Sequence, residues 1–245
     1  MEAFTLSRKD MADLLSSLKG QTDSTPIQVL QDAWSITYKD EVNAFISSGC
    51  PSIFEKILKG NKTEFGFSLN EIVSLANQIE YTTLSSSAVQ NWVKRDIKEL
   101  VGSPLLGKKY TVEQAATLLI VKDLKASLDF ESIRKILTLV FNNPEDRSDD
   151  IIDPIDLYSA YSSVFDKVHH QPVPQIKNDG SMNDWMDQFI KDECEGILPS
   201  FKNLNEENLD IVLNVLLVTA LTVQAAYYQS ATKRYAQAAL FMQGI

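Results

Sequence analysis

The amino-acid sequence predicts an all-α protein, and three observations lead to this class. Apolar residues recur at intervals of three and four in nearly every segment, as they do on one face of a helix. Several of these runs follow a helix-capping residue, and no alternation of β-branched and polar residues is long enough for a central strand. With 245 residues, 44% of them hydrophobic, the chain can bury one sizeable core or two small ones.

The first 64 residues are expected to form an N-terminal helical cap. Ser7 is a candidate cap for a helix that stops at Gly20, since serine favours the first position and glycine the last. A short helix from Pro26 to about Trp34 and another over about 38–47 should follow. Pro51 stands at a plausible helix start, with Gly60 as the end of that helix.

Residues 65–142 form a second predicted unit, in which two capping boxes fix the helix starts. Ser68 with Glu71 opens one helix and Thr111 with Gln114 opens another. Asp129 should cap a further helix. Between the two boxes, a connection of seven residues leads to a helix predicted from about Ser86 to Leu100.

Residues 143–245 form the third predicted unit, an acidic helical region. It begins with Asn142 to Asp153, whose composition is that of a linker or an exposed loop. Helices are then predicted over about 154–168, 181–197 and 205–242.

The last predicted helix contains an uncharged stretch over residues 211–232, long enough to span a bilayer. Amides and hydroxyls interrupt that stretch, so we expect no membrane insertion. We expect instead a helix that is buried in the core or that forms a dimer interface.

Charge is distributed unevenly along the chain, whose formal net charge is -10. Residues 81–142 carry nine basic and six acidic groups, a net charge of +3. Residues 143–210 carry five basic and 16 acidic groups, a net charge of -11. Because backbone phosphates dominate nucleic-acid affinity, only the first of these segments could attract a nucleic acid.

The two cysteines and two histidines predict no metal site and no cofactor. Cys50 and Cys194 are far apart without metal-ligand spacing, which fits reduced, buried thiols. His169 and His170 are expected on an extended segment, where neighbouring side chains point apart. No phosphate-binding glycine loop or zinc-protease motif is present, so we predict that the protein is not an enzyme. The N-terminus has no secretory signal pattern, which indicates a cytoplasmic protein.

A polar stripe on the predicted helix 86–100 is the strongest functional indication. Apolar residues at helical spacing should face the core, and the opposite face carries Gln90, Asn91, Lys94, Arg95 and Lys98. Amides can pair with adenine edges, and cations can contact phosphates or guanine, as in a recognition helix. Ser86 and Ser87 stand at the helix start, where hydroxyls and free N–H groups can bind a phosphate.

A glycine-bounded turn follows this helix and has the size of a small wing. Gly102 and Gly107 bracket it, and Lys108 and Lys109 should approach the DNA backbone from there, next to Tyr110. The alternative is that the basic stripe is an ordinary solvated helix face.

This segment resembles the winged helix-turn-helix of MerR-type regulators. Trp92 matches the aromatic of their recognition helix, Tyr110 the wing tyrosine, and Phe130 to Ile133 their closing motif. More closely, it is similar to bacterial domain-of-unknown-function family 1836, through Asn91–Lys94, Lys108–Tyr110 and Leu124–Lys125. Gln90 and Asp96–Ile97 depart from the MerR pattern. The resemblance implies a DNA-binding fold.

Two functions follow as hypotheses. The first is a transcriptional regulator that binds double-stranded DNA as a homodimer, in which the ten site residues named above contact DNA. The second is a non-enzymatic interaction module, in which the helix-turn-helix is a scaffold and residues 143–245 bind a protein partner. Trp185, Met186, Phe189 and Ile190 would form its docking stripe.

Overall fold

Helices make up the regular secondary structure of the part of the chain that the structure describes. The computed structural model describes residues 4–38, 50–60, 65–170, 182–201 and 204–243. Within these ranges there are eleven α-helices. Backbone pairing of the β type occurs there only at isolated bridges, which do not form a strand. The all-α class is therefore confirmed for the described ranges, and the helix predicted over 38–47 lies mostly outside them.

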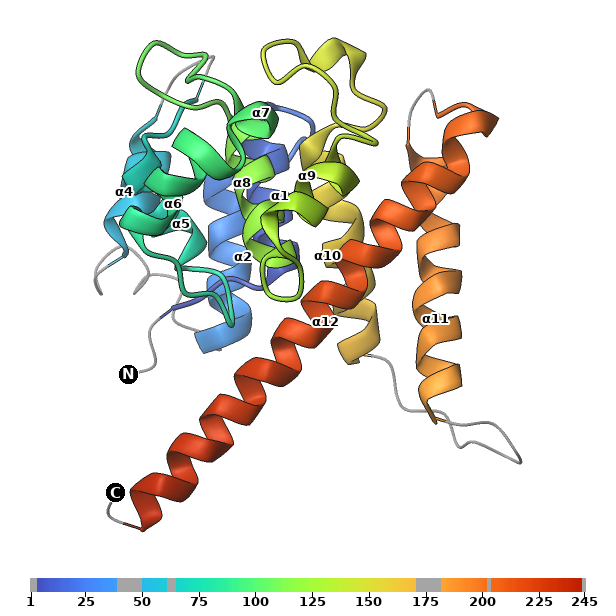
Figure 1. Cartoon of the computed structure of the whole chain (residues 1–245). Helices are drawn as coiled ribbons and strands as arrows, with labels where there is room; N and C mark the ends of the chain where they lie inside the picture. Colours follow the sequence, from blue (N-terminus) through green and yellow to red (C-terminus); the bar gives the residue numbers. More distant parts are fainter. Residues whose placement is uncertain (1–3, 39–49, 61–64, 171–181, 202–203, 244–245) are drawn as a thin grey trace.

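Helix α8 (Val112–Leu124) lies at the centre of the fold, and all its residues except Lys122 are buried. Helices α1 (Arg8–Lys19), α10 (Pro154–His170) and α12 (Glu206–Met242) pack against it (Figure 1). One hydrophobic cluster joins side chains from all three predicted units, among them Leu14, Leu119 and Leu216. The three-part division of the chain itself stays a prediction.

The predicted caps form the helix starts. Ser7 and Thr111 each close a capping box, with Asp10 and with Gln114 respectively. Helix α1 ends at Gly20, whose φ of 73° lies in the left-handed region that favours glycine. A third capping box, at Ser68, opens α5 (Leu69–Ala76), and Asp129 caps α9 (Phe130–Leu137).

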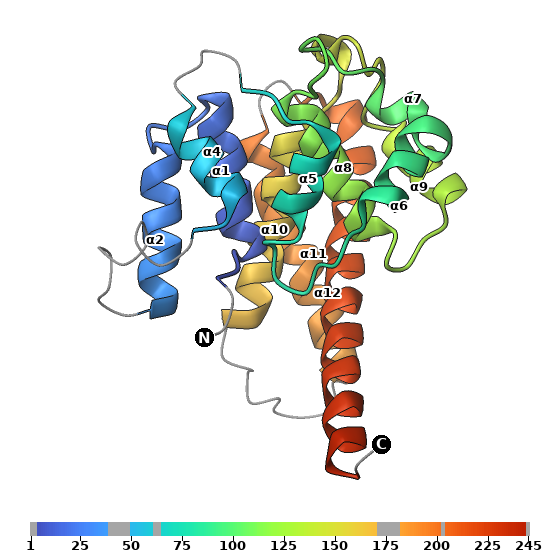
Figure 2. The same ribbon diagram turned by 90° about the vertical axis from the view of Figure 1, so that its left-hand side faces the viewer.

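Helices α2 (Pro26–Tyr38) and α4 (Ser52–Lys59) lie on the side of the body away from α12 (Figure 2). Phe4 joins them to the core, because its ring lies 5.0 Å from that of Trp34 and 5.9 Å from that of Phe54. Helix α4 also contacts α5, so this side supports the predicted helix-turn-helix.

A buried ion pair links α1 to α8. Arg8 is 1% exposed, and its Nε and Nη2 donate to the two carboxylate oxygens of Asp123, at 3.2 and 2.9 Å. The Tyr161 hydroxyl of α10 donates to the same carboxylate, at 3.0 Å. Arg8 Nη1 donates to the carbonyl of Glu80 (3.3 Å), so this pair holds three helices and the turn after α5 together.

Helix α12 has two halves with different surroundings. Its first half contributes buried side chains such as Val212, Leu216 and Val223, packed between α8, α10 and α11 (Met182–Ile197). Its second half extends away from the body in both views, with Tyr235 77% and Phe241 84% exposed.

Among the described residues, α12 is the one helix long and apolar enough to cross a membrane, and 44% of its most apolar window is buried in the protein. The core helices of soluble proteins can have this length and composition too.

The helix predicted from Ser86 to Leu100 is wrong as one continuous helix. It consists of α6 (Ser86–Asn91), a π-helical turn (Trp92–Asp96) and α7 (Lys98–Val101). Ile97 interrupts the helix, with φ of -135°. Arg134 of α9 donates to the carbonyl of Asp96 at 2.7 Å, so a contact distant in sequence satisfies this carbonyl at the break.

Asn142 to Asp153 forms a largely exposed loop, as its composition predicts, and two contacts of Arg147 hold it against the body. Arg147 donates to the carbonyl of Leu100 at 2.9 Å, and its guanidinium lies 5.5 Å from the centre of the Phe141 ring. A short 3-10 helix, Arg147–Asp149, forms here, and another, Leu198–Ser200, follows α11.

The two histidines lie on the last turn of α10, not on an extended segment as predicted. Their Nδ1 atoms lie 2.9 Å from the carbonyls of Phe165 and Asp166, one turn earlier in the same helix.

Candidate nucleic-acid interface

The turn between α5 and α6 is fixed by one amide side chain. Asn77 Oδ1 accepts a hydrogen bond from the Leu84 N–H (2.8 Å), and Asn77 Nδ2 donates to the Leu84 carbonyl (3.0 Å). Ser85 then caps α6 by accepting from the Ala88 N–H at 3.3 Å. These bonds set the direction in which α6 leaves the turn, so α5 and α6 form a crossed pair of defined geometry.

The polar stripe predicted from the sequence lies on the surface. Val89, Val93 and Ile97 face the core as predicted, each at most 8% exposed, while Trp92 is half-buried with its ring centre 5.6 Å from that of Phe130. The opposite face exposes Gln90, Asn91, Lys94, Arg95 and Lys98. Ser87 is exposed beside them at the helix start, and Ser86 is half-buried. Despite the break in the helix, most of these side chains are exposed, as predicted.

The charges of this stripe are only partly compensated. Arg95 Nε lies 2.8 Å from Asp96 Oδ1, and this hydrogen bond and charge raise the pKa of the guanidinium. Glu99 pairs with Arg134 of α9 at 2.8 Å. Lys94 and Lys98 form no ion pair with a residue that the structure describes. They are therefore the most available cations of the stripe.

The predicted wing is a minimal hairpin turn. The N–H groups of Leu106 and Lys109 donate to each other's carbonyls, at 2.9 and 3.1 Å, around Gly107 with φ of 68°. Phe67 and Tyr110 exchange a second such pair of bonds, at 2.9 and 2.7 Å. Isolated bridges stand where a wing would have paired strands, so the described residues do not show a winged helix-turn-helix. We name residues 102–110 the basic turn.

The site residues of the basic turn differ in their surroundings. Lys108 is exposed and Lys109 is half-buried, so both ammonium groups can reach the surface. The Tyr110 side chain is only 7% exposed, and burial raises the pKa of its hydroxyl. Tyr110 thus lies apart from the exposed stripe, within the base of the turn.

Gln114 holds the basic turn against α8. Its Nε2 donates to the carbonyls of Val101 and Ser103, both at 2.7 Å, and its Oε1 accepts from the Thr111 N–H at 3.0 Å. The N–H of Leu105 lies 3.4 Å from the same Oε1. Gln114 is fully buried, so one side chain satisfies both ends of the turn.

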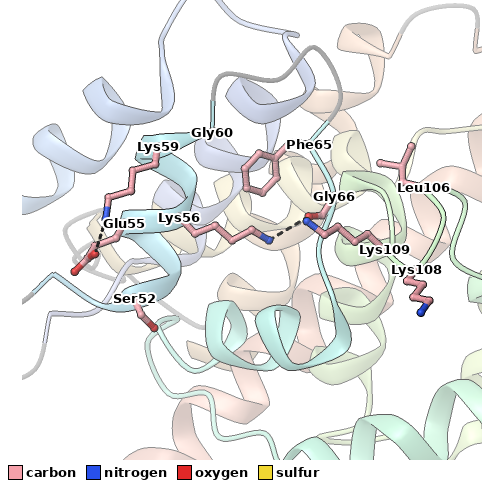
Figure 3. A pocket seen from close by; sticks show the side chains of 10 residues that line it. All are labelled: Ser52, Glu55, Lys56, Lys59, Gly60, Phe65, Gly66, Leu106, Lys108 and Lys109. Carbon is pink, nitrogen blue, oxygen red and sulfur yellow. Dashed lines mark hydrogen bonds and ion pairs between the residues drawn. The ribbon is translucent and has the colours of Figure 1, made fainter.

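A second group of lysines lies across a groove from the basic turn. Figure 3 shows α4 on one side, with Lys56 and Lys59, and Lys108 and Lys109 on the other. The groove encloses about 930 Å³. Lys56 pairs with Glu71 at 2.6 Å, and Lys59 pairs with Glu55 at 3.0 Å. Lys56 and Lys59 are additional to the site residues predicted from the sequence, although their spacing of three residues places them on one face of a helix.

No group of three or more His, Cys, Asp or Glu side chains that could hold a metal lies in the described ranges. Both cysteines are free thiols, Cys50 half-buried and Cys194 buried. Burial, with a smaller effect of neighbouring glutamates, raises the pKa of Cys194 to about 12, so this thiol stays protonated at neutral pH.

Comparison with known proteins places the chain in a family. The model of a domain of unknown function, DUF1836, matches residues 63–162, which include α5, α6 and the basic turn. The "uncharacterized protein YkrK" of Bacillus subtilis (strain 168) is 41% identical over 230 residues, which cover 94% of this chain and 96% of that relative. No solved structure matches the chain. The chain therefore belongs to the DUF1836 family.

Proposed function

We propose that this protein is a transcriptional regulator that binds double-stranded DNA through a MerR-like winged helix-turn-helix. Helices α5 and α6, with the π-helical turn, are its helix-turn-helix, and the basic turn is its wing. The observation that carries the proposal is the exposed stripe of two amides and three cations along α6, the π-helical turn and α7, in a protein of net charge -10. Such a regulator acts in the cytoplasm and needs no cofactor to bind DNA.

The structure suggests a division of roles within this surface. Gln90 and Asn91 have the amides that can pair with adenine edges in a major groove. Lys94 and Lys98, which lack carboxylate partners among the described residues, would contact phosphates. The Arg95 guanidinium forms an ion pair with Asp96, so a guanine or phosphate that binds Arg95 would replace that carboxylate.

Phosphate contacts are also expected at both ends of the stripe. The hydroxyls of Ser86 and Ser87 lie at the start of α6, and Lys108 and Lys109 lie on the basic turn. Lys56 and Lys59 would extend the cationic surface across the groove next to the turn. Tyr110 would support the turn from beneath, since its ring is buried.

Duplex binding should be steeply salt-dependent and should require the stripe. In fluorescence-anisotropy titrations of random genomic duplexes, about four phosphate contacts predict roughly a hundredfold loss of affinity between about 50 and about 200 mM salt. A Lys94→Ala/Arg95→Ala variant should lose about tenfold or more in affinity at low salt, because two of these cations are removed.

The matched control is Lys167→Ala/Lys191→Ala, which removes two positive charges from α10 and α11. It should bind duplexes within about twofold of the unmodified protein. Absent or salt-independent binding by folded protein would contradict the proposal, as would equal losses in both variants.

We further propose that the protein acts as a homodimer formed through the second half of α12. Leu221, at the end of the first half, and then Tyr228, Tyr235 and Met242 recur every seven residues along this helix, and all are exposed, at 45, 55, 77 and 77%. A seven-residue repeat of apolar side chains is typical of a coiled-coil seam. Ala231 and Ala238 lie between them on the same face and allow close approach of a second helix. A twofold dimer would present two helix-turn-helix units to one duplex.

Tyr235→Glu should convert the dimer to a monomer at micromolar concentration, because it places a charge in the centre of this seam. Sedimentation equilibrium should give about half the mass of the unmodified protein. Gln237→Glu adds the same charge about 200° around the helix and should leave the dimer intact. A monomeric unmodified protein, or equal effects of both substitutions, would contradict the seam.

The interaction-module hypothesis has weaker support from the geometry. Of the predicted docking stripe on α11, Ile190 is buried and Met186 packs on the core, while the half-buried Trp185 and Phe189 rings stack at 5.3 Å. Two of the four side chains therefore pack on the core, and the Trp185 and Phe189 rings stay partly exposed. Folded protein that binds no duplex at low salt would favour a protein partner for residues 143–245 instead.

A further inference from the structure

A second cationic groove lies where α12 leaves the body, and the proposed DNA-binding surface does not include it. The turn after α5, the core-facing side of α6 with Trp92, the end of α8 and the second half of α12 form its walls, and it encloses about 800 Å³. This volume lies in the range of small-molecule sites. We name it the α12 groove.

The charged side chains that line the α12 groove are all positive. Lys122, Lys125 and Lys233 contribute three ammonium groups, and none of the described lining residues is an aspartate or a glutamate. The chain as a whole has 33 acidic and 23 basic residues, so a carboxylate-free wall with three lysines departs from its average surface. Such a concentration of positive charge favours an anionic occupant.

Lys122 is the best-placed of the three lysines. It is the one residue of α8 that is not buried, and it lines the groove near the C-terminal end of that helix. Burial lowers the pKa of its ammonium group, and the positive charges of Arg8 and Lys233 add to this effect against the opposing Asp123 carboxylate. Lys122 forms no ion pair in the described structure, so a bound anion would supply a partner that the protein does not.

Uncharged donors complete the lining. The hydroxyls of Thr82, Thr83 and Ser230 and the amide of Gln229 border the groove. Hydroxyl and amide groups together with ammonium groups are the donors that bind phosphate oxygens in proteins. Tyr81 and Trp92 add aromatic surface at the edge, against which an apolar part of the ligand can pack.

We propose that the α12 groove binds a small phosphate-bearing molecule, with Lys122 and Lys233 as its principal cationic contacts. The recessed position of Lys122 favours a small ligand that enters the groove over a duplex backbone, which contacts lysines at the outer surface. The inference does not depend on DNA binding.

A ligand at this position would touch two parts of the protein at once. Tyr81, in the turn after α5, has φ of 57°, a conformation that a residue with a bulky side chain rarely adopts. The centre of the Tyr81 ring lies 5.2 Å from that of Tyr227 on α12. The Arg234 guanidinium, also on α12, lies 5.6 Å from the centre of the Tyr81 ring. The groove thus bridges the turn that orients α6 and the helix that leaves the body.

Isothermal titration calorimetry with sodium pyrophosphate tests the proposal, with sodium chloride adjusted to hold ionic strength constant. The unmodified protein should bind pyrophosphate with one saturable site. Lys122→Gln and Lys233→Gln should each weaken its affinity by about tenfold, because each removes one charge-assisted contact. Circular dichroism of each variant should match that of the unmodified protein.

Lys191→Gln, which removes one exposed lysine of α11, is the matched control and should leave the affinity unchanged. No saturable binding, or equal affinities of the Lys122→Gln and Lys191→Gln variants, would overturn the proposal. Duplex titrations of the same variants separate the two sources of phosphate. If Lys122→Gln weakens duplex binding as strongly as Lys94→Ala/Arg95→Ala, the groove is part of the DNA surface and the small-ligand proposal is overturned.

Discussion

An Asp123→Ala variant should lose about 3–5 kcal/mol of folding free energy. Asp123 accepts three hydrogen bonds, two from Arg8 and one from the Tyr161 hydroxyl. Its removal leaves the Arg8 guanidinium, 1% exposed, as a buried charge without a carboxylate partner. The carboxylate raises the pKa of that guanidinium against the opposing effect of burial, so Arg8 stays charged and cannot relieve the cost by deprotonation.

Urea unfolding followed by circular dichroism measures this loss. The double variant Arg8→Met/Asp123→Leu should be clearly more stable than Asp123→Ala, because an apolar pair of similar volume leaves no buried charge. Asp13→Ala is the exposed control, since it breaks the Lys9–Asp13 pair on the surface, and it should change stability by less than about 1 kcal/mol. Equal losses for Asp13→Ala and Asp123→Ala would contradict the importance of the buried pair.

Gln114→Glu should cost about 3 kcal/mol, although the two side chains have nearly the same shape. The amide Nε2 of Gln114 donates to two carbonyls at 2.7 Å, and a carboxylate oxygen in that place can donate to neither. It would also place a negative charge against the carbonyls of Val101 and Ser103. The basic turn should loosen, and hydrogen exchange of the Leu106 and Lys109 amides should become faster.

Gln78→Glu is the matched control, because the Gln78 amide is exposed and its one hydrogen bond, to the Ser74 carbonyl, is 3.5 Å long. It should change stability by no more than about 0.5 kcal/mol. If the turn positions Lys108 and Lys109 for DNA, Gln114→Glu should also weaken duplex binding under conditions where the variant remains folded. Unchanged stability and exchange in Gln114→Glu would show that Gln114 does not hold the turn.

Most helix starts could be predicted because a cap is a local device. Ser7, Ser68, Thr111 and Asp129 each bond to a backbone N–H three residues ahead, so a short stretch of sequence contains all the information. The helix expected over about 205–242 forms as α12, and its cap, Asn205, is likewise a local device that bonds to the Asn208 N–H.

The break in the helix predicted over 86–100 could not be predicted in this way. Residues 86–100 have helical apolar spacing throughout, and the spacing correctly placed Val89, Val93 and Ile97 in the core. The carbonyl of Asp96 instead accepts from Arg134, 38 residues later in the chain. The packing of Asn142 to Asp153 likewise depends on a distant partner, the Leu100 carbonyl bound by Arg147. Neither contact has a local sequence signal.

The candidate site was predictable where it follows one helix face and unpredictable where it joins separate elements. The stripe from Gln90 to Lys98 follows from spacing alone. The contribution of Lys56 depends on how α4 packs beside the basic turn, and burial of the Tyr110 ring depends on its bridge to Phe67. Both arrangements come from tertiary contacts, which spacing does not encode.

Because α12 is continuous, the number of its residues fixes how its outer part is oriented relative to the body. Val223 is anchored in the core, whereas Tyr228 and Tyr235 lie on the part that extends outward, and no loop separates them. Each residue of an α-helix advances the chain by about 1.5 Å and rotates it by about 100°. A single insertion or deletion between Val223 and Tyr228 would therefore rotate the seam by more than a quarter turn relative to α6, although no side chain in either half had changed. The number of residues in that stretch sets the angular phase between the two helix-turn-helix units of the proposed dimer.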